Sequence, residues 1–148
     1  MSVSAQDFFS TWEQNQIRKA IEKAELDTSG EIRIHVENLC KGDALDRAAF
    51  IFKQLGMEKT ELRNGVLIYL AIKDRKFAII GDMGINSVVP PGFWDDIKQE
   101  MLISFQKNEF CTGLCNALES VGEHLKKHFP YNKDDVNELT DDISFGKE

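Results

Sequence analysis

The sequence predicts an α/β protein, a three-layer αβα sandwich around a central sheet, and three observations support this prediction. Residues 66–72 form an unbroken apolar run, which is typical of a strand covered on both faces. Residues 77–80 form a second such run, and the polar residues 73–76 between them predict an antiparallel hairpin. Segments of helical periodicity stand before, between and after the predicted strands. This order favours a sheet with helices on both faces.

The first helix is predicted to begin after Ser10, because Ser10 and Glu13 have the spacing of a capping box, and to end near Leu26. Residues 31–37 then alternate between apolar and polar side chains, which predicts a strand with one wetter face. We therefore expect this strand near a sheet edge. His35, the histidine on the wetter face, is expected to have an ordinary surface role.

Asp43 is expected to cap a second helix that Gly56 ends, and two further helices are predicted over residues 93–105 and 110–125. Residues 83–91 are expected to form a long loop with at most a short strand. The apolar stripe expected on the second helix comprises Leu45, Ala48, Ala49, Phe52 and Leu55. Each helix thus carries one apolar face, as layers packed on a sheet require.

We divide the chain into one domain, residues 1–130, and an acidic C-terminal tail, residues 131–148. A chain of 148 residues fits a single domain. The tail is rich in Asp and Glu, but it lacks the glycine and the closing glutamate of an EF-hand loop. Its spaced apolar residues leave room for it to dock back on the body.

Charge and cysteine content limit the classes of function. The formal net charge of -7 argues against nucleic acid or an anionic membrane as the main partner and favours cations. Three cysteines without a Cys-x-x-Cys pair indicate neither a disulfide framework nor a zinc knuckle. No export signal is recognisable, and no segment is long enough for membrane insertion. We therefore expect a cytoplasmic protein.

Polar residues are expected to gather at one end of the predicted sheet. A right-handed crossover would make strands 31–37 and 66–72 parallel. Glu31 should then lie at the same sheet end as Asn64 and Asp82, where oxygen ligands suit Ca²⁺ or Mg²⁺. The candidate metal ligands are Asp82, Asn64, Glu61, Glu31 and Asp95, together with backbone carbonyls of the two loops. The alternative is that Asn64 and Asp82 are simply turn residues.

Two residue pairs stand four apart on the last predicted helix. His124 and His128 share one face, a spacing found in metal sites, but their favourable interaction with the C-terminal end of the helix dipole is the simpler explanation. Cys111 and Cys115 have the same spacing and are interpreted as packing residues.

The motifs of common enzymes are not found in the sequence. It contains no Gly-x-Ser-x-Gly elbow, no Gly-x-x-x-x-Gly-Lys loop and no Gly-x-Gly-x-x-Gly. A cysteine-dependent phosphatase needs an arginine six residues after its nucleophile, where Cys40 has Asp46. No nucleophile with a base beside it is recognisable. The sequence therefore favours a binding module over an enzyme.

Four segments form a recognisable set: Ser-Gly-Glu-Ile-Arg at 29–33, Arg-Asn-Gly-Val-Leu-Ile-Tyr-Leu at 63–70, Gly-Asp-Met-Gly-Ile at 81–85 and Phe-x-x-Gly-Leu at 110–114. Together they resemble the TPM domain, a family named after its thylakoid, photosystem-repair and nematode membrane-protein members. The resemblance extends from the first helix to about Pro130. It is greatest to the stand-alone bacterial members, which lack a signal peptide and a membrane anchor.

The resemblance implies a four-stranded mixed sheet and a pair of crossing loops held by divalent metal ions, usually calcium. These loops correspond to the approach to Asn64 and the segment after Asp82. Motif matches therefore support Asn64 and Asp82 as ligands, whereas Glu31, Glu61 and Asp95 depend on our placement of the loops. An acid phosphatase activity is attributed to the plant thylakoid member, but this chain shows no recognisable phosphatase apparatus.

Two functions are compatible with these observations. The first is a cytosolic module whose crossing loops are ordered by one or two Ca²⁺ or Mg²⁺ ions and which contacts a protein partner in that state. The alternative is a metal-assisted acid phosphatase that acts on phosphate monoesters, in which the ion activates water. A structural adaptor without an ion would not respond to calcium at all.

Overall fold

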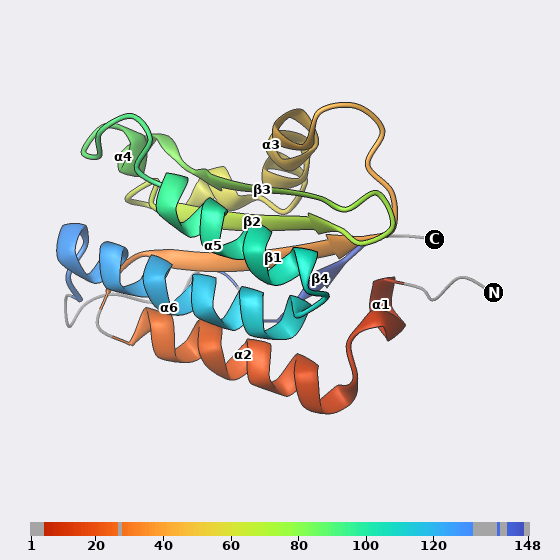
Figure 1. Ribbon diagram of the computed structural model, residues 1–148. Coiled ribbons are helices and arrows are strands. Elements are labelled where there is room, and N and C mark those ends of the chain that lie inside the picture. Colours follow the sequence, from red (N-terminus) through yellow and green to blue (C-terminus); the bar gives the residue numbers. More distant parts are fainter. Residues whose placement is uncertain (1–4, 27, 132–138, 140–141, 147–148) are drawn as a thin grey trace.

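The elements of the computed structural model form three layers, and the model describes residues 5–26, 28–131, 139 and 142–146 (Figure 1). The strands are β1 (Glu31–Glu37), β2 (Gly65–Ala71), β3 (Lys76–Gly81) and β4 (Ser144–Phe145). The helices are α1 (Ala5–Phe8), α2 (Thr11–Glu25), α3 (Ala44–Gln54), the 3₁₀ helix η1 (Met57–Lys59), α4 (Met83–Asn86), α5 (Asp95–Gln106) and α6 (Phe110–His128). Helix α3 covers one face of the sheet, whereas α2, α5 and α6 cover the other. The predicted αβα sandwich with a four-stranded mixed sheet is confirmed.

The sheet has the strand order β3-β2-β1-β4. Strand β2 runs parallel to β1 and antiparallel to β3, as the predicted crossover and hairpin require. In this register Glu31 lies opposite Gly65, and Val66 lies opposite Gly81. The starts of β1 and β2 and the end of β3 therefore meet at one end of the sheet.

The fourth strand of the sheet comes from the C-terminal segment. Strand β4 pairs in parallel with β1, with His35 opposite Ser144. The predicted position of β1 near a sheet edge is confirmed, because, of the described strands, only the two-residue strand β4 lies outside it. The predicted loop over residues 83–91 begins with the short helix α4, which Asp82 caps through a hydrogen bond from the Met83 amide.

The division of the chain at residue 130 stays a prediction. Residues 132–138, 140–141 and 147–148 of the predicted tail lie outside the described residues. Within the described part, Ile143 is buried and β4 joins the sheet. None of the helices in that part combines the length and the apolar character needed to cross a membrane. The cytoplasmic location stays a prediction as well.

The two faces of the sheet bury separate apolar clusters. The larger cluster joins α2, α5 and α6 to alternate residues of the strands, among them Ile34 and Ile68. The smaller cluster joins α3 to Leu67 and Tyr69 of β2. Ala48, Ile51 and Phe52 are the buried residues of α3. Leu45 and Ala49, which were also predicted on this stripe, are exposed, because only the Ala48 side of α3 meets the sheet. The capping box of Ser10 and Glu13 is confirmed at the start of α2.

Candidate functional site

Two loops cross at the sheet end where β1, β2 and β3 meet. We call them the crossing loops: residues 57–64, which precede β2, and residues 82–94, which follow β3. They touch backbone to backbone, since the Gly84 amide donates to the Arg63 carbonyl at 2.9 Å. A side chain at position 84 would collide with the carbonyl oxygens of Leu62 and Arg63. Glycine is therefore required at the crossing point.

An ion pair joins the crossing loops above this contact. The Arg63 guanidinium donates two hydrogen bonds to the Asp82 carboxylate, from Nε to Oδ2 at 2.7 Å and from Nη2 to Oδ1 at 2.8 Å. Asp82 is only 7% exposed, and its Oδ1 also accepts the Met83 amide. The hydrogen bond to Asp82 raises the pKa of Arg63, and the charges of Asp82 and Glu58 raise it further. Two carboxylates therefore act on this guanidinium.

Two buried oxygens on the first crossing loop have no hydrogen-bond partner among the described residues. They are Oε2 of Glu58 and Oγ1 of Thr60. Thr60 and Arg63 belong to the same backbone turn, because the Thr60 carbonyl accepts the Arg63 amide at 3.2 Å. Nearly all buried polar atoms have a partner in the protein, an ordered water or an ion, so each unpaired atom requires an explanation. Sequence reasoning missed Glu58, Thr60 and Arg63, although Arg63 directly precedes Asn64 in the motif that drew attention to this loop.

The structure brings the backbones of three predicted ligands together. The Glu31 amide donates to the Asn64 carbonyl at 3.3 Å, and the Asp82 amide donates to the Gly65 carbonyl at 2.9 Å. The predicted meeting of Glu31, Asn64 and Asp82 at one sheet end is thus seen in the backbone.

The side chains of the predicted ligands point to different partners. The Asn64 amide donates to the Ser29 carbonyl at 3.1 Å, and the Glu31 carboxylate accepts the Leu139 amide at 2.6 Å. Glu61 and Asp95 are exposed. Over the described residues, no group of three or more His, Cys, Asp or Glu side chains is arranged to hold a metal ion. The five-residue ligand set therefore stays a prediction.

A second polar cluster lies at the other end of β1, around Glu37. Arg47 donates to both carboxylate oxygens of Glu37, at 2.8 and 2.9 Å. The Tyr69 hydroxyl donates to the same carboxylate, and His35 Nε2 lies 3.2 Å from its Oε1. Burial alone would raise the pKa of Glu37, but hydrogen bonds from Arg47, Tyr69 and His35 outweigh it and lower this pKa to about 2. Glu37 is therefore ionised and fully partnered at neutral pH.

His35 belongs to this cluster, and its predicted surface role is wrong. The residue is 4% exposed, and its Nδ1 lies 2.9 Å from the Ser144 hydroxyl on β4. A hydroxyl therefore does lie beside a base, contrary to the sequence expectation. Hydroxyl, imidazole and carboxylate in a row have the connectivity of a hydrolase triad. Glu37 also binds Arg47 and Tyr69, and His35 is buried. We therefore interpret this row of hydrogen bonds as structural, because it holds β4 against β1.

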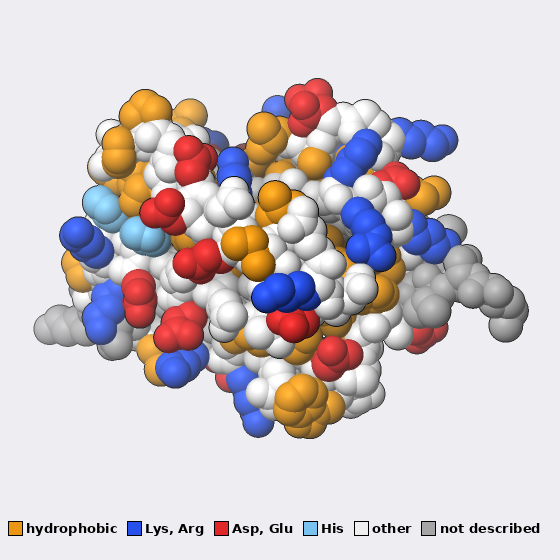
Figure 2. Space-filling view, in the orientation of Figure 1, with side chains coloured by type: hydrophobic (Ala, Val, Ile, Leu, Met, Phe, Trp, Pro, Cys, Tyr) orange, Lys and Arg blue, Asp and Glu red, His pale blue; other side chains and the backbone are white. Residues whose placement is uncertain are grey.

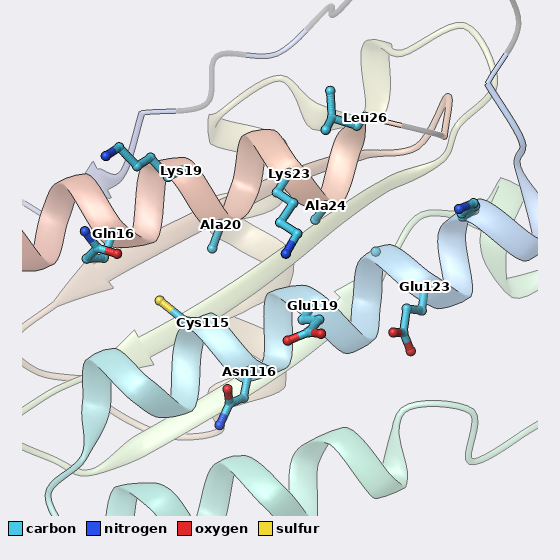
Figure 3. A pocket seen from close by; sticks show the side chains of 12 residues that line it. Gln16, Lys19, Ala20, Lys23, Ala24, Leu26, Cys115, Asn116, Glu119 and Glu123 are labelled. Atoms are coloured by element: carbon cyan, nitrogen blue, oxygen red, sulfur yellow. The ribbon is translucent and has the colours of Figure 1, made fainter.

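A groove of about 490 Å³ opens between α2 and α6 (Figure 3). Lys23 on α2 and Glu119 on α6 lie on its opposite walls. Further lysines and glutamates line it, so neither sign of charge dominates. The two helices approach closely at one end, where a side chain at position 122 would meet Ala24 at 2.8 Å. The mixed lining does not indicate a particular class of ligand.

Comparisons with known proteins agree with the sequence resemblance. The family model of the TPM domain matches residues 2–124. The NMR structure of the BA42 protein from the psychrophilic bacterium Bizionia argentinensis has a TM-score of 0.89 and 44% sequence identity, and the match covers 95% of this chain and 97% of that chain. A comparison with curated proteins returned no match.

Two more distant structures share the fold. The N-terminal domain of a protein from P. gingivalis has a TM-score of 0.67 and 17% identity, with 82% of this chain and 78% of that chain covered. The N-terminal domain of the cg2496 protein from Corynebacterium glutamicum has a TM-score of 0.64 and 16% identity, with 80% and 74% covered. The family match spans most of the sequence and includes both crossing loops. The chain therefore belongs to the TPM domain family.

Proposed function

We propose that the crossing loops bind a divalent cation, calcium or magnesium, and that Asp82, Glu58 and Thr60 supply oxygen ligands. The observation that carries this proposal is the pair of buried, unpartnered oxygens, Glu58 Oε2 and Thr60 Oγ1, on the loop that Arg63 joins to Asp82. Hard cations of this class bind carboxylate, hydroxyl and carbonyl oxygens. The donor chemistry of these residues therefore fits such an ion.

Arg63 competes with the ion in this proposal. Its guanidinium holds both Asp82 oxygens and lies in the field of Glu58, so it is a built-in cation at the same place. An ion that binds these carboxylates must displace it. The Arg63 side chain is 37% exposed and can turn into solvent when displaced. Ion binding and the arrangement of the crossing loops are then linked, because an ion that binds only one arrangement favours it by its differential affinity.

The remaining predicted ligands have different roles in the proposal. Asn64 holds Ser29 and thereby fixes the start of β1 beside β2. Glu61 and Asp95 are exposed on or beside the crossing loops. Glu31 would require release of the Leu139 amide before it could bind an ion. Asp82 is thus the predicted ligand with the strongest support.

The crossing loops also expose apolar side chains that suit the proposed protein partner. Leu62, Met83 and Val88 are each more than half exposed, at 51%, 60% and 53%. Hydrophobic side chains gather over α4 in the space-filling view (Figure 2). Exposed apolar residues that gather on one surface commonly mark a contact with another protein. A cation that orders these loops would therefore order a candidate contact surface.

Thermal unfolding and calorimetric titration of chelator-stripped protein test the cation proposal. Calcium or magnesium should raise the unfolding midpoint of the wild type, with about 2.7 kcal/mol of stabilisation at an ion concentration 100 times Kd. Asp82→Asn and Glu58→Gln should lose most of this response, and Arg63→Gln should bind the ion more tightly. Asp96→Asn, an exposed change in the first turn of α5, is the matched control.

Two outcomes contradict the proposal. A wild-type midpoint that neither ion shifts removes the cation site. An equal response in the wild type, Asp82→Asn and Glu58→Gln places the ion elsewhere on the molecule.

The acid phosphatase alternative stays a prediction that derives from the family resemblance. An ion at Asp82 could polarise a phosphoryl oxygen and activate water. Metal-dependent hydrolysis of p-nitrophenyl phosphate that Asp82→Asn abolishes would support it. Ion binding without turnover would support the binding module instead.

A further inference from the structure

The C-terminal end of α6 carries two histidines that the proposed cation site does not use. His124 and His128 are one helical turn apart, a spacing that places both side chains on the same face. His124 is half-buried and His128 is exposed. Pale-blue histidine side chains lie next to each other on the surface that Figure 2 shows. Both imidazoles are therefore accessible from one side.

A single aromatic ring orients both imidazoles. The Phe93 ring centroid lies 4.6 Å from that of His124 and 5.6 Å from that of His128, with interplanar angles of 62° and 72°. Phe93 belongs to the second crossing loop, which packs here on the end of α6. The two histidine rings thus border one apolar ring on one side and remain open to solvent on the other. Packing of this kind restricts side-chain rotamers and lowers the entropy lost on binding.

We propose that His124 and His128 form a binding site for a first-row transition metal ion such as Ni²⁺, Cu²⁺ or Zn²⁺, with water in the remaining positions. Neutral imidazole nitrogen suits these ions, whereas calcium and magnesium prefer oxygen. The site is therefore chemically distinct from the one proposed at Asp82. It lies beyond the proposed function, which uses oxygen ligands only.

The position of the pair at a helix end favours a cation. The C-terminal end of a helix carries a partial negative charge, which stabilises positive charge placed beside it. The same interaction explains why histidines are favourable here without any metal. A metal dication bound by both rings would gain from the same interaction with the helix end. The positive charge of Lys127, one residue before His128, would repel the ion.

Calorimetric titration of the full chain with Ni²⁺ tests the site. Ni²⁺ is the preferred probe because Cu²⁺ oxidises free thiols and Zn²⁺ binds them, and the chain has three free cysteines. Either His124→Ala or His128→Ala should weaken Ni²⁺ binding by about tenfold or more. Mutation of a residue that only hydrogen-bonds to a metal ligand already lowers metal affinity by about tenfold. Lys127→Ala, on the same turn, should not weaken binding. Excess Ca²⁺ should not displace the Ni²⁺.

Circular dichroism confirms that each variant is folded before its titration is interpreted. The proposal is overturned if Ni²⁺ binds both alanine variants as tightly as the wild type. It is also overturned if only one substitution weakens binding, because the ion then uses a single histidine and the pair is not the site.

Discussion

The two arginine–carboxylate pairs of this protein are nearly identical in geometry and differ in their surroundings. Arg63 donates two hydrogen bonds to Asp82, at 2.7 and 2.8 Å, and Arg47 donates two to Glu37, at 2.8 and 2.9 Å. The arginine side chains are 37% and 38% exposed, and the carboxylates are 6% and 7% exposed. By geometry and burial alone, neither pair is the better candidate for function.

The difference lies in the polar atoms around each pair. Glu37 is also bound by Tyr69 and His35, so the whole cluster is satisfied within the protein. Beside Asp82, in contrast, Glu58 and Thr60 each keep a buried oxygen without a partner among the described residues. A satisfied buried network stabilises and specifies a fold, whereas each unpaired buried atom requires an explanation, such as strain, a water or an ion. The comparison therefore supports a stabilising role for the Glu37 cluster and leaves the Asp82 cluster as the candidate for the proposed cation.

The largest expected effect on stability comes from Glu37→Gln. This change leaves Arg47 facing a neutral amide in a partly buried position, and removal of one partner of a buried pair typically costs about 3 kcal/mol. Urea unfolding should show this loss in the free energy of unfolding. Asp82→Asn should cost less in the absence of metal. If Asp82→Asn costs more, the assignment of the two clusters is reversed.

The next effect is that of Tyr69→Phe. Tyr69 is fully buried, and its hydroxyl donates to the ionised Glu37 carboxylate. Loss of a hydrogen bond to a charged group costs about 2 kcal/mol. Chemical unfolding measures this loss, and calcium binding should be unaffected. A weakened calcium response in Tyr69→Phe would show that the two clusters are coupled.

The Glu37 cluster also predicts how stability depends on pH. Glu37 has its pKa lowered from 4.5 to about 2 in the folded protein, so its contribution is present above pH 4.5 and is lost as the pH falls towards 2. Burial lowers the pKa of His35 below 6.5, so the unfolded chain takes up this proton first and stability begins to fall below pH 6.5. The free energy of unfolding, measured as a function of pH, should lose its decrease between pH 4.5 and 2 in Glu37→Gln. In His35→Gln it should lose its decrease just below pH 6.5. Unchanged slopes would contradict these assignments.

The smallest expected effect on stability is that of Arg63→Gln. When the partly exposed guanidinium is lost, Asp82 keeps its hydrogen bond from the Met83 amide, whereas Arg47 also lies over the Phe50 ring. We expect the unfolding midpoint of the metal-free protein to change less than in Arg47→Gln. The calcium response should increase at the same time, because the competing cation is gone. A decrease in that response would mean that Arg63 supports the ion site instead of competing for it.

The fold could be predicted where local pattern determines structure. The apolar runs of β2 and β3 and the polar turn between them identify the hairpin. The Ser10 and Glu13 pair marks the start of α2, and the crossover rule brings β1 beside β2. These signals act over a few residues or follow from chain handedness, so one sequence is enough to detect them.

The surroundings of β1 could not be predicted, because its partner is distant in the sequence. The polar residues of β1 alternate as on a wet face, but described residues of the C-terminal segment contact this face. Glu31 accepts the Leu139 amide at 2.6 Å, and Arg33 donates to the Asp142 carbonyl at 3.3 Å. Nothing in the alternation distinguishes a face covered by polar contacts from a face covered by water.

The candidate site was predictable by location and less so by ligand. The crossover placed Asn64 and Asp82 at the correct sheet end, since that depends on strand direction alone. The partner of Asp82 depends on the loop crossing at Gly84, which brings Arg63 back over β3. Side-chain contacts between two loops depend on how the loops pack in the folded protein. They could not be predicted from the spacing of residues in the sequence.

Strand β4 has a consequence for the synthesis of this protein on the ribosome. His35 and its partner Ser144 are 109 positions apart, so the outer edge of β1 stays unpaired until the C-terminal segment emerges. An unpaired edge readily joins strands of other chains. The Glu25 carboxylate accepts the Ile32 amide at 2.8 Å and so protects one donor of this edge. A nascent chain that lacks residues 144 and 145 would thus carry an incomplete sheet with an unpaired strand edge.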